Sequence, residues 1–209
     1  FSYDNASPRM AVSTKGVIHL VYGRNPKPDI AGYGEIYHQA SADGGKTWSA
    51  PKELTDDNPA ILRGQYFPNI SVAPNGRVDA VWWDTRDDPG IRSNDVYYTS
   101  SGDDGRTWSA NRRITDRSID RSVGVWSNNI DSSHAVGIAS TNKSIYFAWQ
   151  DSRNSNREAQ PEDVYMASLR MDGAVAATDD GDVVPSWGIA DVGVVVGMGR
   201  VMSDGWLTP

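Results

Sequence analysis

The sequence predicts an all-β protein built from repeated units of four antiparallel strands, and three observations support this prediction. An eight-residue pattern, Ser-x-Asp-x-Gly-x-Thr-Trp, occurs at residues 41–48 and again at residues 101–108. Short apolar segments recur around both copies with the same spacing of 60 residues, from Ser41 to Ser101. The chain also holds 20 Gly, 11 Pro and 8 Trp and has no long stretch of helical periodicity, which is typical of many short strands joined by turns.

The composition excludes several classes of protein. With 209 residues, 38% hydrophobic and 22% charged, the chain can bury a single-domain core. Its net charge of -7 argues against nonspecific binding of nucleic acid or of anionic membranes. The lack of Cys excludes disulfides, a thiolate nucleophile and Cys-ligated metals. No apolar run reaches the roughly 20 residues that a membrane span needs. Because the chain begins at Phe1, we expect it to be processed or a fragment.

Each octapeptide copy follows one short strand and precedes another, so it is predicted to form a hairpin turn. Its Gly permits a positive φ, and its Asp can accept hydrogen bonds from backbone N–H groups. Its Trp is expected to fold back as an apolar plug. We call these segments the octapeptide turns; their defining residues are Ser41, Asp43, Gly45, Thr47 and Trp48, and Ser101, Asp103, Gly105, Thr107 and Trp108.

The other predicted strands recur with the turns. First strands are expected at residues 8–12, 68–72 and 135–139. The second strands, at residues 17–22, 78–83 and 145–149, are almost continuously apolar, which indicates burial on both faces. A long polar loop then leads to third strands at residues 35–37, 95–97 and 163–165, and fourth strands are expected near Leu54 and Ile114. Four antiparallel strands per repeat predict the blades of a β-propeller.

The predicted blades span residues 1–56, 57–116 and 117–180, all within one propeller domain. In the third unit Met171 stands where the octapeptide Asp is expected, so that turn is degenerate. Residues 181–209 are predicted to form a partial fourth blade or a closing strap. Since propellers have about 4 to 8 blades, the sequence predicts an incomplete ring. The remaining blades would come from a longer chain or from self-association, because open blade edges favour association.

The octapeptide pattern and the repeated blade resemble the Asp-box (BNR) repeat of the sialidase (neuraminidase) superfamily, a β-propeller family. The resemblance covers nearly the whole chain but only about half of a family fold. It implies that the octapeptide turns are scaffold. It also implies that a site lies on the opposite face, where second-to-third-strand loops and blade connections gather. Where the family carries an Arg-Ile-Pro signature, this chain has Pro8-Arg9-Met10-Ala11, and the family's Tyr nucleophile belongs to later blades.

Three arginines on the predicted loop face lie in related sequence contexts. Trp83-Asp84-Thr85-Arg86 is similar to Trp149-Gln150-Asp151-Ser152-Arg153, and Tyr22-Gly23-Arg24 is a partial copy. Repetition in every blade favours a structural role, such as an Asp–Arg pair that holds the loop. The alternative is that Arg24, Arg86 and Arg153 converge near the axis and bind a carboxylate through their planar guanidinium groups, as the three arginines of sialidases do.

Residues that occur only once are the other candidates for function, because aromatic faces stack on sugars and Arg side chains bind hydroxyls and carboxylates. They are Arg63, Tyr66, Arg121, Trp126, His134 and Glu158. The predicted substrate-binding set is Arg24, Arg63, Arg86, Arg121, Trp126 and Arg153. The acid of a glycosidase could be Asp57, Asp120 or Asp131, but no complete catalytic set emerges. No metal or cofactor is predicted, since the three His lack ligand spacing and His19 falls in a buried strand.

These observations predict a sialidase-like propeller that recognises a glycan or glycoconjugate through its loop-rich face. In this interpretation the chain is a noncatalytic portion of a larger protein and is extracellular or surface-exposed. Two alternatives stay open: an exo-acting glycoside hydrolase of sialidase type, and a structural repeat segment of a larger assembly. The octapeptide turn identifies the blade and leaves the activity open, because fold and function are separable.

Overall fold

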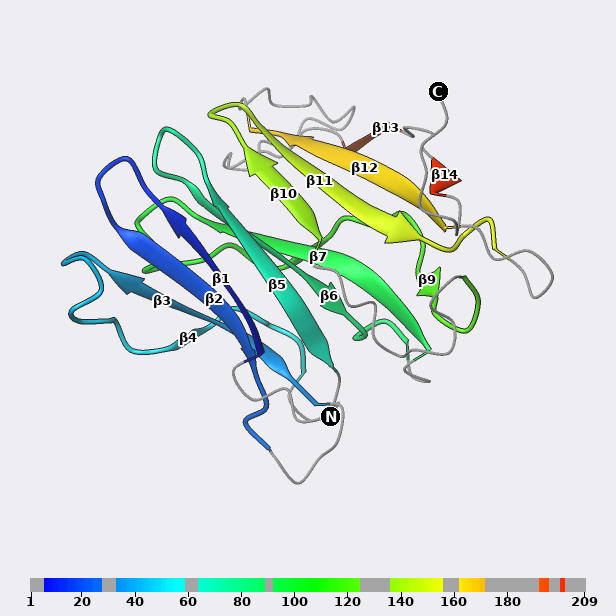
Figure 1. Ribbon diagram of the computed structural model, residues 1–209, viewed down its shortest axis with the longest axis horizontal. Coiled ribbons are helices and arrows are strands. Elements are labelled where there is room, and N and C mark those ends of the chain that lie inside the picture. Colours follow the sequence, from blue (N-terminus) through cyan, green and yellow to red (C-terminus); the bar gives the residue numbers. More distant parts are fainter. Residues whose placement is uncertain are drawn as a thin grey trace, which may run out of the picture.

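The computed structural model describes residues 6–27, 33–58, 64–88, 92–124, 136–155, 162–171, 192–195 and 200–201. Within these residues the chain is all-β, and its strands form three antiparallel sheets that lie one after another (Figure 1). We call the sheets blade 1, blade 2 and blade 3. The described part of the chain contains no helix with the length and apolarity that a membrane crossing requires.

In each blade the strands follow one another in chain order. Blade 1 consists of β1 (Ala6–Val12), β2 (Ile18–Arg24), β3 (Glu35–Ser41) and β4 (Lys52–Glu53). Blade 2 consists of β5 (Gln65–Val72), β6 (Val78–Asp84), β7 (Ser93–Ser101) and β8 (Arg112–Arg113), with β9 (Ile119–Asp120) paired to β7. Blade 3 consists of β10 (Gly137–Ser140), β11 (Ser144–Asp151), β12 (Glu162–Arg170) and β13 (Val192–Val195), with β14 (Arg200–Val201) paired to β12.

The pairing register makes positions in different blades comparable. The last residue of the second strand pairs with an acidic residue at the start of the third strand: Arg24 with Glu35, Asp84 with Asp95, and Asp151 with Asp163. Arg24 therefore stands where the other two blades have Asp. The prediction that Arg24 is a partial copy of the later arginines is corrected by this register, and the 60-residue spacing of the sequence places Arg24 at the position of Asp84 as well.

Two buried apolar clusters hold the blades together. One joins Val21 and Ile36 of blade 1 to Trp82 of blade 2, and the other joins Trp83 of blade 2 to Phe147 of blade 3. Neighbouring residues of β6 thus point to opposite blades. This arrangement explains the continuous apolarity of the strand, and every residue of β6 is buried. Alternate positions of β2 are only half-buried, because the described chain places a blade on one side of β2 only.

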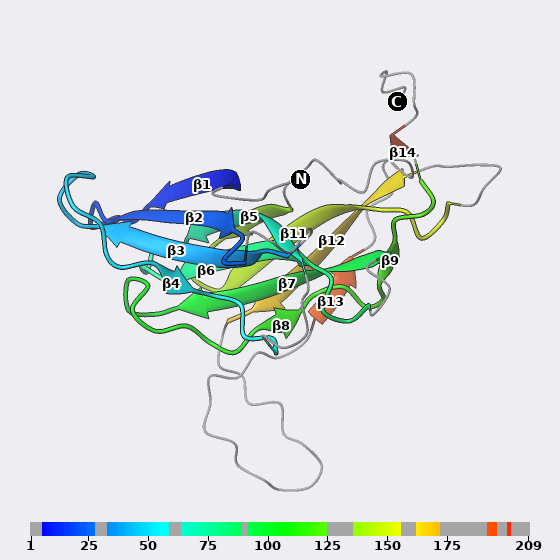
Figure 2. The same cartoon turned by 90° about the horizontal axis from the view of Figure 1, so that it is seen from below.

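Both octapeptide turns form the same hydrogen-bonded loop, and they lie at the same side of the molecule (left in Figure 2). Asp43 accepts hydrogen bonds from the Thr47 amide at 2.9 Å and from its hydroxyl at 2.6 Å. Asp103 makes the equivalent bonds with Thr107 at 2.9 and 2.7 Å. These bonds stabilise the carboxylates and lower the pKa of each Asp to about 2. Gly45 has φ +87°, as a turn of this shape requires.

The octapeptide tryptophans differ between the blades. Trp108 packs against the cluster between blades 1 and 2, and its ring centroid lies 5.0 Å from that of His38 in blade 1. It therefore acts as the predicted plug. Trp48 does not, because its side chain is 38% exposed. The physical reason is that an octapeptide Trp packs on the preceding blade, and the described chain places no blade before blade 1.

The apolar run at residues 192–201 is only partly described. Val192–Val195 pairs with β12 and forms the outer strand of blade 3. Blade 3 lacks an octapeptide turn after Arg170, so the outer edge of β12 is free to pair with a later apolar segment. The partial fourth blade or closing strap expected for residues 181–209 stays a prediction where it falls outside the described residues.

Candidate functional site

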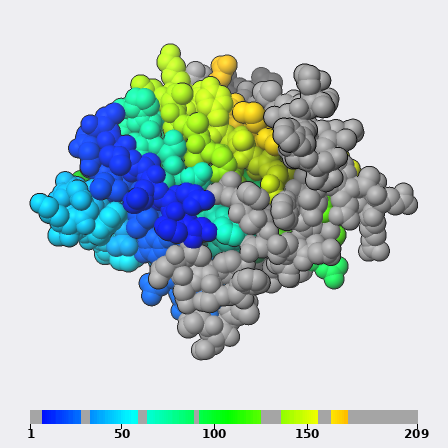
Figure 3. Space-filling model, viewed as in Figure 1, coloured from blue at the N-terminus to red at the C-terminus, as the bar shows by residue number. Residues whose placement is uncertain are grey.

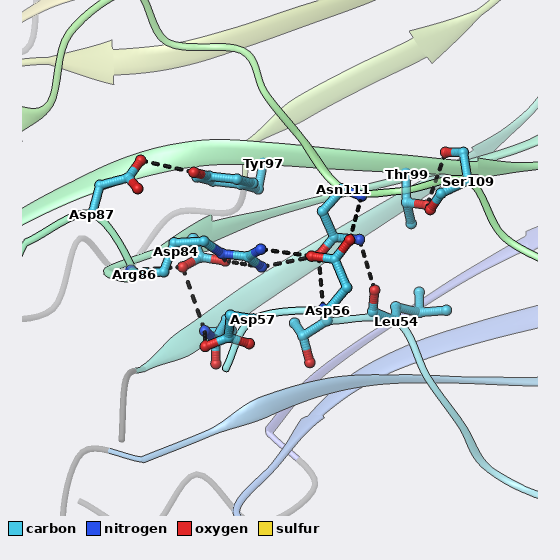
Figure 4. A network of polar contacts seen from close by, with 12 residues as sticks. Leu54, Asp56, Asp57, Asp84, Arg86, Asp87, Tyr97, Thr99, Ser109 and Asn111 are labelled. Atoms are coloured by element: carbon cyan, nitrogen blue, oxygen red, sulfur yellow. Dashed lines mark hydrogen bonds and ion pairs between the residues drawn. The ribbon is translucent and has the colours of Figure 1, made fainter. Parts of the chain in front are cut away.

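Polar side chains from different blades meet on the loop face, opposite the octapeptide turns. Arg86, just after β6, is the centre of the network drawn in Figure 4. Its guanidinium lies 2.7 Å from the carboxylates of Asp84 and of Asp56, and it donates to Asn111 Oδ1 at 2.9 Å. It also lies over the Tyr97 ring, 4.3 Å from the centroid. Since Asp56 follows the last strand of blade 1, Arg86 clamps blade 2 to blade 1.

Arg153 repeats this clamp between blades 2 and 3. Its guanidinium lies 2.6 Å from Asp151 and 2.9 Å from Asp116, which follows the last strand of blade 2. It also lies 3.9 Å from the centroid of the Tyr165 ring. The hydrogen bond from Arg153 lowers the pKa of Asp116. Both clamp carboxylates within the blades, Asp84 and Asp151, are fully buried.

Arg24 does not form such a clamp in the described part of the chain. Its side chain is exposed, and its guanidinium lies 5.8 Å from the centroid of the Tyr37 ring. The contacts of the described residues do not link Arg24, Arg86 and Arg153 to one another. Their convergence on a single carboxylate stays an untested prediction. Arg86 and Arg153 each donate to two aspartates, and Arg153 Nε is a buried donor with no hydrogen-bond partner among the described residues.

A buried acidic side chain lies at the blade 1–blade 2 junction, where the sequence did not single it out. Glu35, the first residue of β3, is only 3% exposed. Burial raises its pKa to about 7, and the nearby negative charge of Asp57 adds to the effect, while hydrogen bonds with Thr55 and Tyr33 oppose it. Near neutral pH this carboxyl therefore exists in both protonated and ionised forms.

Asp57 lies beside this group and is nearer to solvent. It is half-buried, and burial raises its pKa while the positive charge of Arg86 opposes the change. Gln65 Nε2 donates to Asp57 at 3.1 Å. Gln65 is fully buried, and its Oε1 atom has no hydrogen-bond partner among the described residues. Among the three acid candidates, Asp57 is thus one whose surroundings in the structure favour the protonated form. Asp120 accepts hydrogen bonds from Ser122.

The equivalent carboxyl at the blade 2–blade 3 junction has a different environment. Asp95 occupies the same register position in blade 2 as Glu35 in blade 1, but it lies 2.8 Å from the Arg113 guanidinium. It further accepts hydrogen bonds from Thr115 at 2.6 Å and from Ser118 at 2.9 Å. Arg113 faces Tyr97 across the sheet, in the register position that Glu53 occupies opposite Tyr37 in blade 1. Glu35 therefore lacks the cation that Asp95 has.

Two candidates that occur once in the sequence lie together. Tyr66 lies near the start of β5, which contacts both β1 and β10. Arg121 Nη1 donates a hydrogen bond to Tyr66 Oη, with the guanidinium carbon 5.3 Å from the ring centroid. Asn94 Nδ2 donates to the same phenol oxygen at 3.0 Å. Arg121 Nη2 and Asn94 Oδ1 are buried atoms with no hydrogen-bond partner among the described residues.

The remaining predicted site residues lie outside the described residues. They are Arg63 and Trp126 of the substrate-binding set, together with Asp131, His134 and Glu158. Glu35 was missed because it was considered only as part of a strand. A signal was present, since each third strand begins with an acidic residue in Glu35-Ile36-Tyr37, Asp95-Val96-Tyr97 and Asp163-Val164-Tyr165.

The buried histidines pair with each other. His19 Nδ1 lies 3.1 Å from His38 Nε2, and both side chains are fully buried. Burial lowers the pKa of His38 to about 3, and the neighbouring His19 adds to this effect. The pair is therefore neutral and belongs to the core. No group of three or more His, Asp or Glu side chains in the described ranges is arranged to hold a metal ion.

A groove of about 340 Å³ lies at the outer edge of the blade 1–blade 2 junction. It runs between the fourth strand of blade 1 and the octapeptide turn of blade 2. Its lining residues are Lys52, Glu53, Leu54, Thr55, Asp56, Arg106, Thr107, Trp108, Ser109, Ala110 and Asn111. None of them belongs to the Tyr66–Arg121 pair, so the groove is a separate feature.

Comparisons with known proteins identify the fold. No protein-family model and no curated protein sequence matches the chain. Among solved structures, 80% of the chain matches 35% of a Hadza microbial sialidase at 17% identity and a TM-score of 0.54. It also matches 44% of the GH93 α-L-arabinofuranosidase of Fusarium graminearum in complex with arabinobiose, over 78% of the chain, at 15% identity and a TM-score of 0.55. A family 117 glycoside hydrolase of the marine bacterium Zobellia galactanivorans is matched over 52% of its length at 14% identity and a TM-score of 0.50.

These similarities concern the fold, because the identities are low. The chain spans between about a third and a half of the solved structures it matches. Three consecutive antiparallel sheets with a shared register, together with these neighbours, establish a β-propeller fold with an incomplete ring.

Proposed function

We propose that the loop face of this propeller recognises a glycan and that Arg121, held by Tyr66, is a binding residue. The single observation that carries the proposal is the state of the Arg121 guanidinium. One nitrogen donates to Tyr66 Oη, while Nη2 has no hydrogen-bond partner among the described residues. Nη2 is a buried atom, and a glycan carboxylate or hydroxyl that reached it would supply the acceptor that it lacks.

The two clamp arginines of the predicted set are less suited to this role. Arg86 and Arg153 each pair with two aspartates and lie over a Tyr ring. A glycan carboxylate would have to displace those partners at the cost of an uncompensated buried charge. The solved neighbours named as a sialidase and as an arabinofuranosidase bound to arabinobiose add support, since both act on glycans. A glycan-binding role would place the protein outside the cell or on its surface.

A second candidate function is glycoside hydrolysis, and the carboxyl groups at the blade 1–blade 2 junction favour it. Hydrolysis needs an acid that holds a proton near neutral pH and a second carboxylate. Asp57 is half-buried with a raised pKa, and Glu35 lies close enough for their charges to interact. In this version Asp57 contacts the sugar and donates the proton. Glu35 stays buried and acts through the interaction of its charge with that of Asp57.

One experiment tests both versions on the full chain. Binding to a panel of sialylated and arabinosylated oligosaccharides would be measured by titration calorimetry, and release of a fluorogenic aglycone would report hydrolysis. Arg121→Ala is expected to weaken glycan binding about 10-fold or more, because a charged hydrogen bond contributes about 1.5 to 3 kcal/mol. Arg106→Ala, on an exposed octapeptide turn, is the matched control and should bind normally.

The outcomes separate the candidates. Unchanged affinity in Arg121→Ala, with an unchanged melting temperature, removes Arg121 from the site. Turnover that disappears in Asp57→Asn supports hydrolysis, while binding without turnover in the wild-type protein supports the noncatalytic role. A chain that binds none of the oligosaccharides leaves the structural repeat segment as the better interpretation.

A further inference from the structure

Two buried polar atoms of opposite character belong to the side chains that surround the Tyr66 hydroxyl. Tyr66 Oη accepts hydrogen bonds from Arg121 Nη1 and, at 3.0 Å, from Asn94 Nδ2. The second polar atoms of these two planar groups, Arg121 Nη2 and Asn94 Oδ1, are buried and have no hydrogen-bond partner among the described residues. The first is a donor and the second is an acceptor. We call Tyr66, Asn94 and Arg121 the Tyr66 cluster.

The strands of blade 2 bring these three side chains together on the loop face. Tyr66 lies near the start of β5, which runs between blade 1 (blue) and blade 3 (yellow-green) in Figure 3 and contacts both β1 and β10. Asn94 pairs with Ile119 where β7 meets β9. The Arg121 amide donates to the Arg92 carbonyl at 3.0 Å just beyond that pairing. Asn94 and Arg121 therefore approach Tyr66 from two chain segments that are hydrogen-bonded to each other.

Blade 1 does not repeat the Tyr66 cluster. The strand register places Ala6 in blade 1 at the position of Tyr66 in blade 2. It also places Gly34, which precedes Glu35, at the position of Asn94, which precedes Asp95. The cluster is therefore not an element that each blade needs for its own stability, in contrast to the arginine clamp.

The burial of the cluster makes its two unpaired atoms sensitive to the chemistry of a ligand. Asn94 is 1% exposed and Tyr66 is 5% exposed, whereas Arg121 is half-buried and is therefore the member nearest to solvent. A buried polar atom without a partner is destabilising, and a group that supplies the missing partner removes that cost. A ligand group with the wrong polarity leaves the cost in place, so a site of this kind discriminates between ligands.

We propose that the Tyr66 cluster recognises a neutral sugar through one hydroxyl group, which accepts a hydrogen bond from Arg121 Nη2 and donates one to Asn94 Oδ1. This inference rests on the proposed glycan-binding role of Arg121 and names the group that is recognised. A hydroxyl both donates and accepts, so one hydroxyl serves both atoms. An ionised carboxylate has only acceptor oxygens. It would satisfy Arg121 and would place a second acceptor against Asn94 Oδ1.

The test is titration calorimetry of the full chain, with arabinobiose and lactose as neutral probes and sialyllactose as the acidic probe. A neutral probe should bind about 10-fold or more tightly than sialyllactose. Asn94→Leu keeps the side-chain volume and removes both polar atoms, so it should weaken binding of the neutral probe about 10-fold. Asn154→Leu is the matched control, because Asn154 Nδ2 donates to the Tyr165 hydroxyl at 3.2 Å but the side chain is exposed. This control should bind normally, and circular dichroism would verify that each variant is folded.

Analogues of the neutral probe with a single methylated hydroxyl give the sharpest readout, because a methoxy oxygen accepts a hydrogen bond and cannot donate one. One analogue should bind the wild type about 10-fold more weakly than the unmodified probe, and this difference should vanish in Asn94→Leu. Since the analogues are first tested on the wild type, the proposal can fail even where Asn94→Leu does not fold.

Three outcomes overturn the proposal: tighter binding of sialyllactose than of either neutral probe, full affinity in folded Asn94→Leu, or full affinity of every methylated analogue. If Arg121→Ala still weakens binding in these cases, the proposed function stands and only the hydroxyl is wrongly assigned. A wild-type protein that binds none of the probes contradicts the proposed function together with this inference.

Discussion

The two blade junctions of this propeller share one clamp and differ in the charge around it. In both, an arginine after the second strand pairs with a buried aspartate of its own blade and with an aspartate at the end of the preceding blade. At the blade 2–blade 3 junction the third-strand carboxyl, Asp95, has Arg113 beside it. Burial raises the pKa of Asp95, and Arg113 with two hydroxyl groups opposes the change. At the blade 1–blade 2 junction no described cation lies beside Glu35, and burial raises its pKa to about 7. The Arg–Asp clamp, which both junctions share, is therefore interpreted as scaffold. Glu35, whose surroundings differ between the junctions, is the better candidate for function.

The junctions also differ on the side of the octapeptide turns. Trp108 and Gly105 of blade 2 pack on His38 of blade 1. Blade 3 has no such turn after Arg170, and at this junction Arg77, which pairs with the buried Asp79 of its own blade, donates to the Thr141 carbonyl at 2.9 Å. Aromatic packing occurs at both junctions, since Tyr98 lies edge-on to Phe147, but only the blade 1–blade 2 junction has an octapeptide turn packed on a buried ring.

The largest effect should come from the clamp that both junctions share. Asp84→Ala and Asp151→Ala are each expected to lower the free energy of unfolding by about 3 to 5 kcal/mol, because each leaves a buried guanidinium without its main partner. Urea denaturation measures this. The exposed clamp partners Asp56 and Asp116 serve as controls, and their replacement by Ala should cost less than about 1 kcal/mol. A small loss in Asp151→Ala beside a large loss in Asp84→Ala would contradict the equivalence of the two clamps.

A middle-sized effect should distinguish the blade 1–blade 2 junction, where an octapeptide turn packs on His38. A Cβ atom on Gly105 would lie 2.2 Å from Cε1 of the buried His38 ring, and Gly105 also has φ +83°. Gly105→Ala is therefore expected to cost about 2 to 4 kcal/mol, from the left-handed backbone and from overpacking together.

Gly45→Ala is the matched control for that substitution. Gly45 has a similar φ of +87°, and its nearest neighbour would be Trp48, at 3.9 Å. Gly45→Ala should lower the free energy of unfolding only by the strain of the left-handed backbone, about 1 to 2 kcal/mol. Equal losses in the two variants would mean that His38 moves aside and that this junction is not tightly packed.

The smallest effect at neutral pH, and the most specific, should come from Glu35. The folded-state pKa of Glu35 lies above its ordinary value of 4.5, so its contribution to stability is present below about pH 4.5. That contribution is lost as the pH rises to about 7. Glu35→Gln should abolish this loss, which urea midpoints between pH 4 and 8 would record as a flatter profile.

Two comparisons keep that measurement specific. The lowered pKa of His38 acts in the opposite direction, since its contribution is lost as the pH falls below about 6.5, and it cancels between the wild type and Glu35→Gln. Asp43→Asn is the control, because the pKa of Asp43 is lowered to about 2 by its hydrogen bonds within the octapeptide turn, and this variant should retain the change between pH 4.5 and 7. An unaltered profile in Glu35→Gln would show that another group titrates in this range.

Local patterns were sufficient to predict much of the scaffold. The octapeptide turn is held by bonds among residues that are two to four positions apart, such as Ser41 to Asp43 and Thr47 to Asp43. Its geometry therefore depends on those side chains alone, and the sequence predicted it. The strands of each blade followed from the same local reading of apolar periodicity and turn residues. The repeated Asp–Arg sequence likewise predicted the pairs within blades 2 and 3.

Other features depend on residues distant in the chain, so only the tertiary structure decided them. The state of Glu35 depends on which residue β4 places nearby, and Tyr66 meets Arg121 across 55 positions of sequence. The exposure of Trp48 depends on whether a blade precedes its own. By itself the sequence determined the turns and the strand repeat, since these are local; the partner of each repeated residue was decided by the packing of one blade on the next.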